Sequence, residues 1–356
     1  MKRSLRMGVA GFGLVVALAA SGAEARTAAQ PSVSQMVGQL MFVPMHGTVP
    51  SKYFLARIRS GQIGGVILYA NNYGPAGPAA LVKQLQRTAL QAGRPRLLIG
   101  IDQEGGIVKR LPGAPTLAPS QMATTSVART QGAATARNLR AYGVQVDFAP
   151  VLDIGHGGFI TSRTFGSTPA QVALRATAFA RGLSLGGVAA TGKHFPGLGY
   201  APTNTDKTQT VVRASASQLN ADLAPYRTAI AAGLPIVMVS TAAYPSLGVN
   251  VPAACSRAVV TGLLRGQLGF HGVVVTDALD TADVSAYWPT PQASVRAIGA
   301  GVDMVLAGGG TGRAKSDTSI ASYDALVNAV KTDTLSRSTV AAAYARVLAL
   351  KRTLSY

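Results

Sequence analysis

Cysteine is almost absent from this sequence, which has one, Cys255, in 356 residues. A single thiol forms no intramolecular disulfide and supplies too few ligands for a cysteine-based metal site. The proline and alanines before Cys255 indicate a packed turn, so we expect this thiol to carry no chemistry. Glutamate is also rare, because the 14 carboxylates include only Glu24 and Glu104. Any catalytic pair of carboxylates must therefore be built mainly from aspartates.

The apolar run near the N-terminus, residues 7–20, is too short to span a bilayer, since its length of about fourteen residues falls short of roughly twenty. Three basic residues precede it and the small-x-small tripeptide 23–25 follows it, as in a cleavable signal peptide. No cysteine lies at the cleavage point, which argues against a lipid anchor. We therefore expect residues 1–25 to be a signal peptide, with a membrane anchor as the alternative. Residues 26–356 would then form one domain that is secreted, periplasmic or associated with the cell wall.

Negative charge is scarce as well, because 14 acidic residues stand against 33 basic ones and the formal charge is +19. Loss of residues 1–25 removes three basic residues and one acidic residue and leaves +17. This excess favours association with an anionic cell envelope, although dispersed charge also simply aids solubility. The Lys and Arg residues form no dense run and do not interleave with aromatics, so we expect no nucleic-acid partner.

Eight segments have the character of strands, and most are continuous apolar runs, as expected for strands buried on both faces. They are residues 38–43, 65–69, 97–101, 144–148, 188–191, 236–240, 273–276 and 302–306. Helical segments alternate with them, and several end in glycine just before the next strand. The predicted helices are 78–92, 127–142, 169–185, 221–232 and 291–300, with two more at 319–331 and 339–354.

This alternation predicts a single (β/α)8 TIM barrel of the α/β class. An open doubly wound sheet is the competing architecture, but no glycine-rich dinucleotide fingerprint follows the first strand. In a barrel, chemistry gathers where the strands end. Charged residues stand there after the third, fourth, fifth and seventh strands, and they include Asp102, Glu104, Asp153, Arg163, Lys193, His194 and Asp277.

Such a rim suits hydrolysis of a polyhydroxylated substrate, because one carboxylate attacks or stabilises an oxocarbenium-like centre while cationic donors bind hydroxyls. Phosphate-ester or metal chemistry is the alternative. The sequence contains no His-x-x-x-His pair and no aspartate cluster with ligand spacing, so we expect neither a metal nor a cofactor.

Five motifs occur along the chain in a fixed order: DQEGG at 102–106, FAPVLD at 148–153, SRTFG at 162–166, GKHFPG at 192–197 and GFHGVVVTD at 269–277. Together they resemble glycoside hydrolase family 3, specifically its single-barrel bacterial β-N-acetylglucosaminidases. The resemblance runs from about residue 37 to residue 351. It implies an exported glycosidase that acts on β-linked sugars, most of all terminal N-acetylhexosamine of cell-wall-type glycan. A β-glucosidase-like specificity is the alternative.

The resemblance also implies roles for individual residues. The family uses a retaining mechanism, in which an aspartate after the seventh strand attacks the anomeric carbon, and its motif places that nucleophile at Asp277. The implied substrate-binding residues are Asp102, Arg110, Arg163, Lys193 and His194. The alternative for the two arginines is that they pair with rim carboxylates and hold loops.

The sequence departs from the family at the general acid/base. The family has an Asp-Ser/Thr-His triplet in the loop after the fifth strand, whereas this chain has Asn204-Thr205-Asp206. Three explanations remain open. Asp206 is itself the acid/base, which requires a pKa raised above the usual value of about 3.9; Asp206 binds a sugar hydroxyl and a residue such as His46 supplies the proton; or the barrel binds envelope glycan with weak or no hydrolysis.

Overall fold

The computed structural model describes Met1, residues 30–308 and residues 317–354. The chain divides into two units, Met1–Pro31 and Ser32–Tyr356, and the fold described below belongs to the second. Apart from Met1, the predicted signal peptide lies outside the described residues, so its assignment stays a prediction. Within the part of the chain that is described, no helix has both the length and the apolar character needed to cross a membrane.

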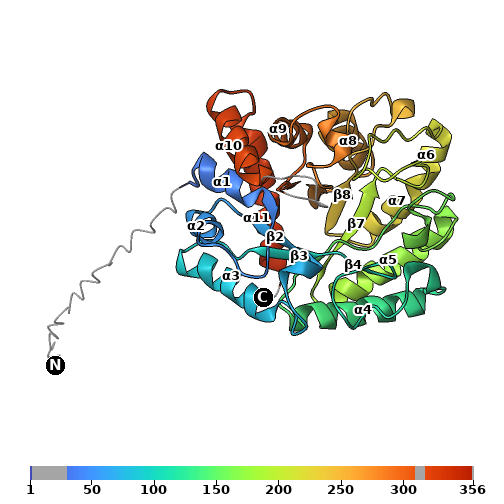
Figure 1. Cartoon of the computed structure of the whole chain (residues 1–356), viewed down its shortest axis with the longest axis horizontal. Helices are drawn as coiled ribbons and strands as arrows, with labels where there is room; N and C mark the ends of the chain where they lie inside the picture. Colours follow the sequence, from blue (N-terminus) through green and yellow to red (C-terminus); the bar gives the residue numbers. More distant parts are fainter. Residues whose placement is uncertain (2–29, 309–316, 355–356) are drawn as a thin grey trace. The chain divides into compact units, whose positions relative to one another are not determined.

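The second unit is built on eight parallel strands that close into a barrel, with helices outside them (Figure 1). The strand order is β10-β1-β2-β3-β6-β7-β8-β9, and closure between the two ends comes from the Thr276 amide, which donates to the Met304 carbonyl at 3.0 Å. The strands are β1 Met41–Pro44, β2 Gly65–Leu68, β3 Leu98–Ile101, β6 Val146–Asp147, β7 Ala189–Phe195, β8 Ile236–Val239, β9 Val273–Thr276 and β10 Val305–Leu306.

The outer layer consists of helices that mostly connect successive strands, as the alternating pattern predicts. They are α1 Val33–Gln39, α2 Lys52–Ser60, α3 Ala79–Gln91, α4 Thr125–Ala141, α5 Pro169–Leu185, α6 Ala216–Asp222, α7 Ala224–Ala231, α8 Ala282–Ser285, α9 Thr290–Ala300, α10 Thr318–Lys331 and α11 Arg337–Thr353. A π-helical segment, η6 at Ala258–Gln267, precedes β9. The predicted (β/α)8 barrel is therefore confirmed.

The first predicted strand was wrong at its start. Residues 38 and 39 belong to α1, which begins at a capping box: the Ser32 hydroxyl accepts from the Gln35 amide, and the Gln35 side chain accepts from the Ser32 amide. Such reciprocal capping stabilises the first turn of a helix. Residues 38 and 39 are nevertheless buried, because the end of α1 packs against the barrel wall. The sequence prediction assigned them to the buried strand that follows.

The predicted helix over residues 221–232 is two helices, α6 and α7, which meet at Leu223. Pro225 lies in the first turn of α7, where a missing amide is tolerated, but a proline cannot continue the hydrogen bonding of a preceding helix. The helices α1, α2 and α8 and the segment η6 were not predicted. Cys255 lies in a short 3₁₀ turn, Ala253–Cys255, and burial raises the pKa of its thiol to about 12.

Most strand sequences are continuous apolar runs because an apolar layer lies on each face of the barrel sheet. One layer fills the barrel interior, where Phe42 and Phe148 meet edge to face with ring centroids 5.2 Å apart. Gly100 makes room for that pair, since a Cβ there would lie 2.8 Å from the Phe42 ring. The other layer lies between the strands and the helices. Each strand therefore has apolar surroundings on both faces.

Candidate active site

The strand ends surround a cavity of about 370 Å³. It is lined by all seven residues that the sequence predicted as site residues: Asp102, Arg110, Arg163, Lys193, His194, Asp206 and Asp277. Ile67, Met238 and Leu306, which belong to the barrel interior, contribute apolar surface. The cavity thus combines a few convergent polar groups with apolar walls, as small-molecule sites commonly do.

Lys193 lies near the end of β7 and connects two carboxylates that follow β3. Its Nζ contacts Asp102 Oδ1 at 2.6 Å and Glu104 Oε1 at 2.7 Å, and its side chain is only 2% exposed. Burial alone would lower the pKa of Lys193, but Asp102 and Glu104 raise it above its ordinary value. The ammonium is therefore charged and held in place, with one of its three donors left for a ligand.

Glu104 is the centre of the charge network. Arg163, in the loop after β6, donates to it twice, from Nε at 2.9 Å and from Nη2 at 2.6 Å. Burial would raise the pKa of Glu104, but Lys193 and Arg163 together lower it to about 2. Such bidentate, charge-assisted pairing fixes the Arg163 side chain at the cavity wall.

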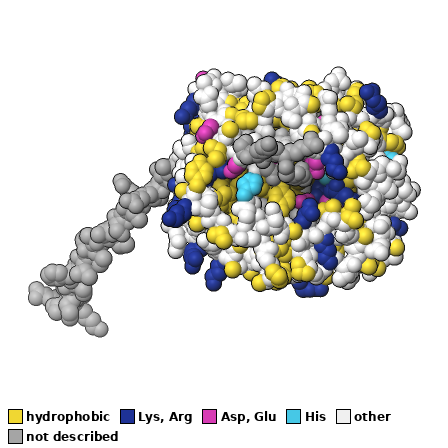
Figure 2. Space-filling model, in the orientation of Figure 1, with side chains coloured by type: hydrophobic (Ala, Val, Ile, Leu, Met, Phe, Trp, Pro, Cys, Tyr) yellow, Lys and Arg dark blue, Asp and Glu magenta, His cyan; other side chains and the backbone are white. Residues whose placement is uncertain are grey.

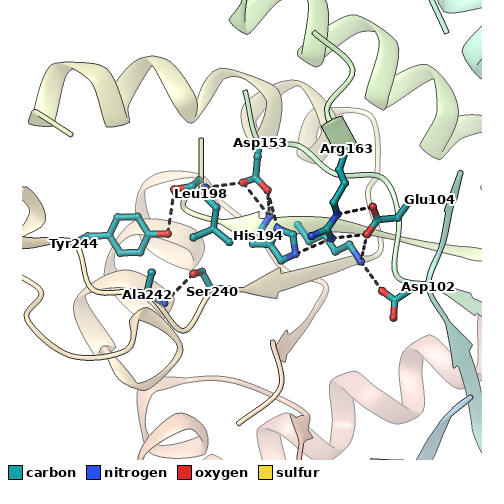
Figure 3. Close-up of polar contacts among 11 residues, drawn as sticks. Asp102, Glu104, Asp153, Arg163, His194, Leu198, Ser240, Ala242 and Tyr244 are labelled. Carbon is teal, nitrogen blue, oxygen red and sulfur yellow. Dashed lines mark hydrogen bonds and ion pairs between the residues drawn. The ribbon is translucent and has the colours of Figure 1, made fainter. Parts of the chain in front are cut away.

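His194 is oriented by Asp153, which follows β6. His194 Nδ1 lies 2.7 Å from Asp153 Oδ2, and the Asp153 carboxylate also accepts from the His194 and Leu198 amides. We infer from this partner that Nδ1 carries the proton in the neutral ring, which leaves Nε2 as the acceptor. Figure 3 shows the row of contacts from Asp153 through His194 and Arg163 to Glu104, and Lys193 links Glu104 to Asp102.

Arg110 reaches the cavity through a hairpin, β4 Gln103–Gly105 with β5 Val108–Lys109, and the buried Gln103 side chain anchors the segment that follows. Gln103 Oε1 accepts from the Arg110 and Leu111 amides, and its Nε2 donates to the Leu111 and Ala114 carbonyls. The Tyr73 hydroxyl donates to the Arg110 carbonyl at 3.1 Å. The backbone that carries Arg110 is therefore fixed from two sides.

Asp206 lies in the loop after β7, at the position where the family has the histidine of its Asp-Ser/Thr-His triplet. Its amide donates to Asn204 Oδ1 at 2.9 Å, which makes Asn204 a local turn-former. Burial and then the Asp277 charge raise the pKa of Asp206 to about 6, against the opposing effects of His194 and Arg163. This carboxyl group is thus partly protonated near neutral pH, as a general acid must be.

Asp277 follows β9, and the strand ladder fixes its backbone. Its amide donates to the Val239 carbonyl at 2.8 Å, and its Oδ1 accepts from the Ala278 amide at 2.8 Å. Asp277 and Asp206 line the same cavity, although 70 residues of chain separate them. Folding therefore brings these two distant carboxylates to the wall of one cavity.

Several residues of the site were not predicted as site residues. Glu104 belonged to a recognised motif, but nothing in the sequence indicated that it, and not Asp102, would accept both cations. Tyr69, at the end of β2, also lines the cavity. Asp283, on α8, lies behind the Asp206 loop: its Oδ1 accepts from the Thr210 amide at 2.8 Å, and its amide donates to the Thr205 carbonyl. No motif identified it.

The other histidines lie elsewhere among the described residues. His46 is not among the residues that line the cavity, and its Nε2 lies 3.0 Å from the Gly308 carbonyl oxygen. His156 contacts Asp222 Oδ1 at 3.0 Å and stacks on Tyr200, which ties the loop after β6 to the loop after β7. Neither histidine is among the residues that line the cavity.

Comparison with known proteins gives the same family as the motifs. Residues 32–350 match the model for the glycosyl hydrolase family 3 N-terminal domain. An uncharacterized secreted glycosyl hydrolase of Arthroderma benhamiae is 36% identical over 332 residues, which cover 89% of this chain and 93% of that protein. A beta-hexosaminidase of Bordetella avium is 38% identical over 265 residues, which cover 70% of this chain and 75% of that protein.

Among solved structures, a family 3 beta-N-acetylglucosaminidase from Paenibacillus sp. FPU-7 superposes with a TM-score of 0.85 at 34% identity. The match covers 91% of this chain and 62% of that longer chain. The family model spans most of the sequence and the relatives exceed 30% identity over most of it. The chain therefore belongs to glycoside hydrolase family 3, as an O-glycosyl hydrolase of the β-hexosaminidase type.

Proposed function

We propose that this protein is an exported retaining β-N-acetylhexosaminidase in which Asp277 is the nucleophile and Asp206 the general acid/base. The observation that carries the proposal is the pairing of these two aspartates in one cavity, with the pKa of Asp206 raised to about 6 by burial and by Asp277. A double-displacement mechanism requires one carboxylate that attacks the anomeric carbon and one carboxyl group that gives up a proton and takes it back.

In the first step, Asp277 attacks the anomeric carbon and the glycosidic C–O bond breaks while Asp206 donates its proton to the leaving oxygen. In the second step, Asp206, now ionised, takes a proton from water, and the water oxygen displaces Asp277 from the anomeric carbon. The product keeps the β configuration, and both aspartates return to their starting states.

The charge network would hold the sugar. Lys193 has one donor left after its two carboxylate contacts, and Asp102 has a second oxygen available to accept from a hydroxyl. His194 Nε2, Arg163 and Arg110 line the same wall. An N-acetyl carbonyl is an acceptor that suits these cationic donors, which favours N-acetylhexosamine over glucose.

Export is part of the proposal. It rests on the signal-peptide pattern of residues 1–25 and on the likeness to a relative that is described as secreted. The net positive charge would then retain the protein at an anionic envelope, where its glycan substrate lies.

Turnover of nitrophenyl β-N-acetylglucosaminide and of the matching glucoside tests the proposal, with NMR assignment of the anomer first released. We expect the acetamido substrate to be preferred, the β anomer to appear first, and Asp277→Ala to abolish turnover. Absent turnover together with measurable glycan binding would overturn it in favour of a binding protein. Release of the α anomer would overturn the retaining mechanism.

The double variant Asn204→Asp/Asp206→His offers a matched control, because it restores the triplet of the family at the same positions. We expect it to keep turnover on substrates with poor leaving groups, which Asp206→Ala should lose. If Asp206→Ala keeps turnover on these substrates, position 206 does not carry the acid/base.

A further inference from the structure

The surface of this protein is depleted of exposed carboxylates. Within residues 30–308 and 317–354, the only exposed acidic side chains are Asp324 and Asp333, on α10 and just after it. The other acidic residues of these ranges are buried or half-buried, and most of them lie in the barrel or near the cavity. Exposed Lys and Arg side chains, in contrast, occur on eight of the eleven described α-helices, all but α1, α6 and α8. Figure 2 shows this imbalance on one face.

Helices α4, α5 and α7 contain no acidic residue at all, and each carries at least one exposed arginine. They lie side by side at one edge of the barrel wall (Figure 1). Between them is a groove of about 860 Å³, continued along α5 by a second hollow of about 380 Å³. We call the two together the α5 groove.

Three arginines, one from each helix, line the α5 groove: Arg129, Arg181 and Arg227. All three are exposed. Arg227 bonds to Asn220, while Arg129 and Arg181 make no side-chain hydrogen bond or ion pair with any other described residue. The groove therefore presents positive charge that no neighbouring carboxylate neutralises.

The lining of the groove also carries hydroxyl groups. Thr125 and Ser126 are exposed, and Thr228 is half-buried, with its Oγ1 donating to the Ala224 carbonyl at 3.1 Å. The groove therefore offers exposed hydroxyl groups beside the arginines.

We propose that the α5 groove binds an extended anionic glycan polymer, separately from the catalytic cavity. The guanidinium groups, which no carboxylate neutralises, suit its carboxylates or phosphates, and the exposed Thr125 and Ser126 hydroxyls suit its sugar hydroxyls. A flat bilayer contacts convex surface and does not reach into a groove. The residues that line the groove include no aromatic side chain on which nucleobases could stack, which disfavours a single-stranded nucleic acid. The proposal rests on these surface features and not on the catalytic roles of Asp206 and Asp277.

Polygalacturonate, a polyuronate, serves as the probe, and neutral dextran as its control. We expect the mature protein to bind polygalacturonate with an affinity that falls as salt rises from about 50 to 200 mM, and not to bind dextran. The variant Arg129→Gln/Arg181→Gln/Arg227→Gln should weaken binding by about tenfold or more at low salt. It should leave turnover of a small nitrophenyl glycoside unchanged, which also verifies folding.

A matched variant, Lys52→Gln/Arg257→Gln/Lys331→Gln, removes the same charge from exposed positions outside the groove. We expect it to weaken binding by less than about threefold. Equal loss in the two triple variants, or tighter binding to duplex DNA or anionic vesicles than to polygalacturonate, would overturn the proposal.

Discussion

The Glu104 carboxylate accepts both Nε and Nη2 of Arg163, at 2.9 and 2.6 Å, while its Oε1 also contacts Lys193 Nζ at 2.7 Å. A single buried carboxylate thus forms ion pairs with two cations that line the cavity. Removal of one member of such a group leaves uncompensated buried charge, so stability and substrate binding depend on the same residue.

We predict that Glu104→Gln lowers the free energy of unfolding by about 3 kcal/mol at pH 7. The pKa of Glu104 is about 2 in the folded state against about 4.3 unfolded, so its contribution is present above pH 4.3 and is lost as the pH falls towards 2. Urea titrations at pH 7 and pH 3 measure both effects. Asp324→Asn, at an exposed site, is the control, and a loss of similar size there would refute this account.

We predict that Asp206→Asn slows hydrolysis of substrates with poor leaving groups by about 10²- to 10⁴-fold, and hydrolysis of activated aryl glycosides much less. The reason is that only a poor leaving group needs a proton. Because the pKa of Asp206 is about 6, wild-type kcat/KM should fall above that pH, and the variant should lose this basic limb. Equal slowing on both substrate types would assign Asp206 a binding role.

Asp283→Asn should stabilise the protein at neutral and alkaline pH. Burial raises the pKa of Asp283 to about 7, above the unfolded value of about 3.9, so wild-type stability falls as the pH rises between these values. Asparagine keeps an acceptor for the Thr210 amide but carries no charge. The expected gain is about 1–3 kcal/mol above pH 7 and little near pH 4. A gain that is independent of pH would show that Asp283 does not titrate in this range.

Lys351→Met should remove a different pH dependence. Lys351 Nζ is buried and donates to Gln39 Oε1 and to the Gly64 carbonyl, both at 2.7 Å, and burial lowers its pKa to about 7. The unfolded chain binds this proton up to about pH 10.4, so wild-type stability should rise with pH from about 7 to 10. Thermal unfolding across that range should show a smaller rise in the variant. The rise should persist in Lys331→Met, at an exposed site.

Much of the fold was predictable from local patterns. Apolar runs and the glycine stops before them depend only on neighbouring residues, and they located all eight strands to within a few residues. One error arose at residues 38 and 39, which are buried like strand residues but belong to α1. Another arose at Pro225, where one apolar pattern is divided between two helices.

The placement of the site residues followed from the fold, because parallel strands bring their carboxyl ends together. Which of them would pair did not follow. Lys193 and Asp102 are 91 positions apart, and Arg163 and Glu104 are 59 apart. Contacts over such separations depend on side-chain direction and on the loops that carry each residue, and no sequence pattern encodes either.

The segment Thr191–Asp206, which runs from β7 into the loop after it, illustrates the division. By itself, the sequence determined the family, through five motifs in order, and located the departure at Asn204 and Asp206. Only the tertiary structure decided how Asp206 is surrounded, with burial and Asp277 raising its pKa and His194 and Arg163 opposing them. The physical reason is that residue types and their order are local properties, whereas a pKa depends on every charge and every buried surface that folding brings near the group.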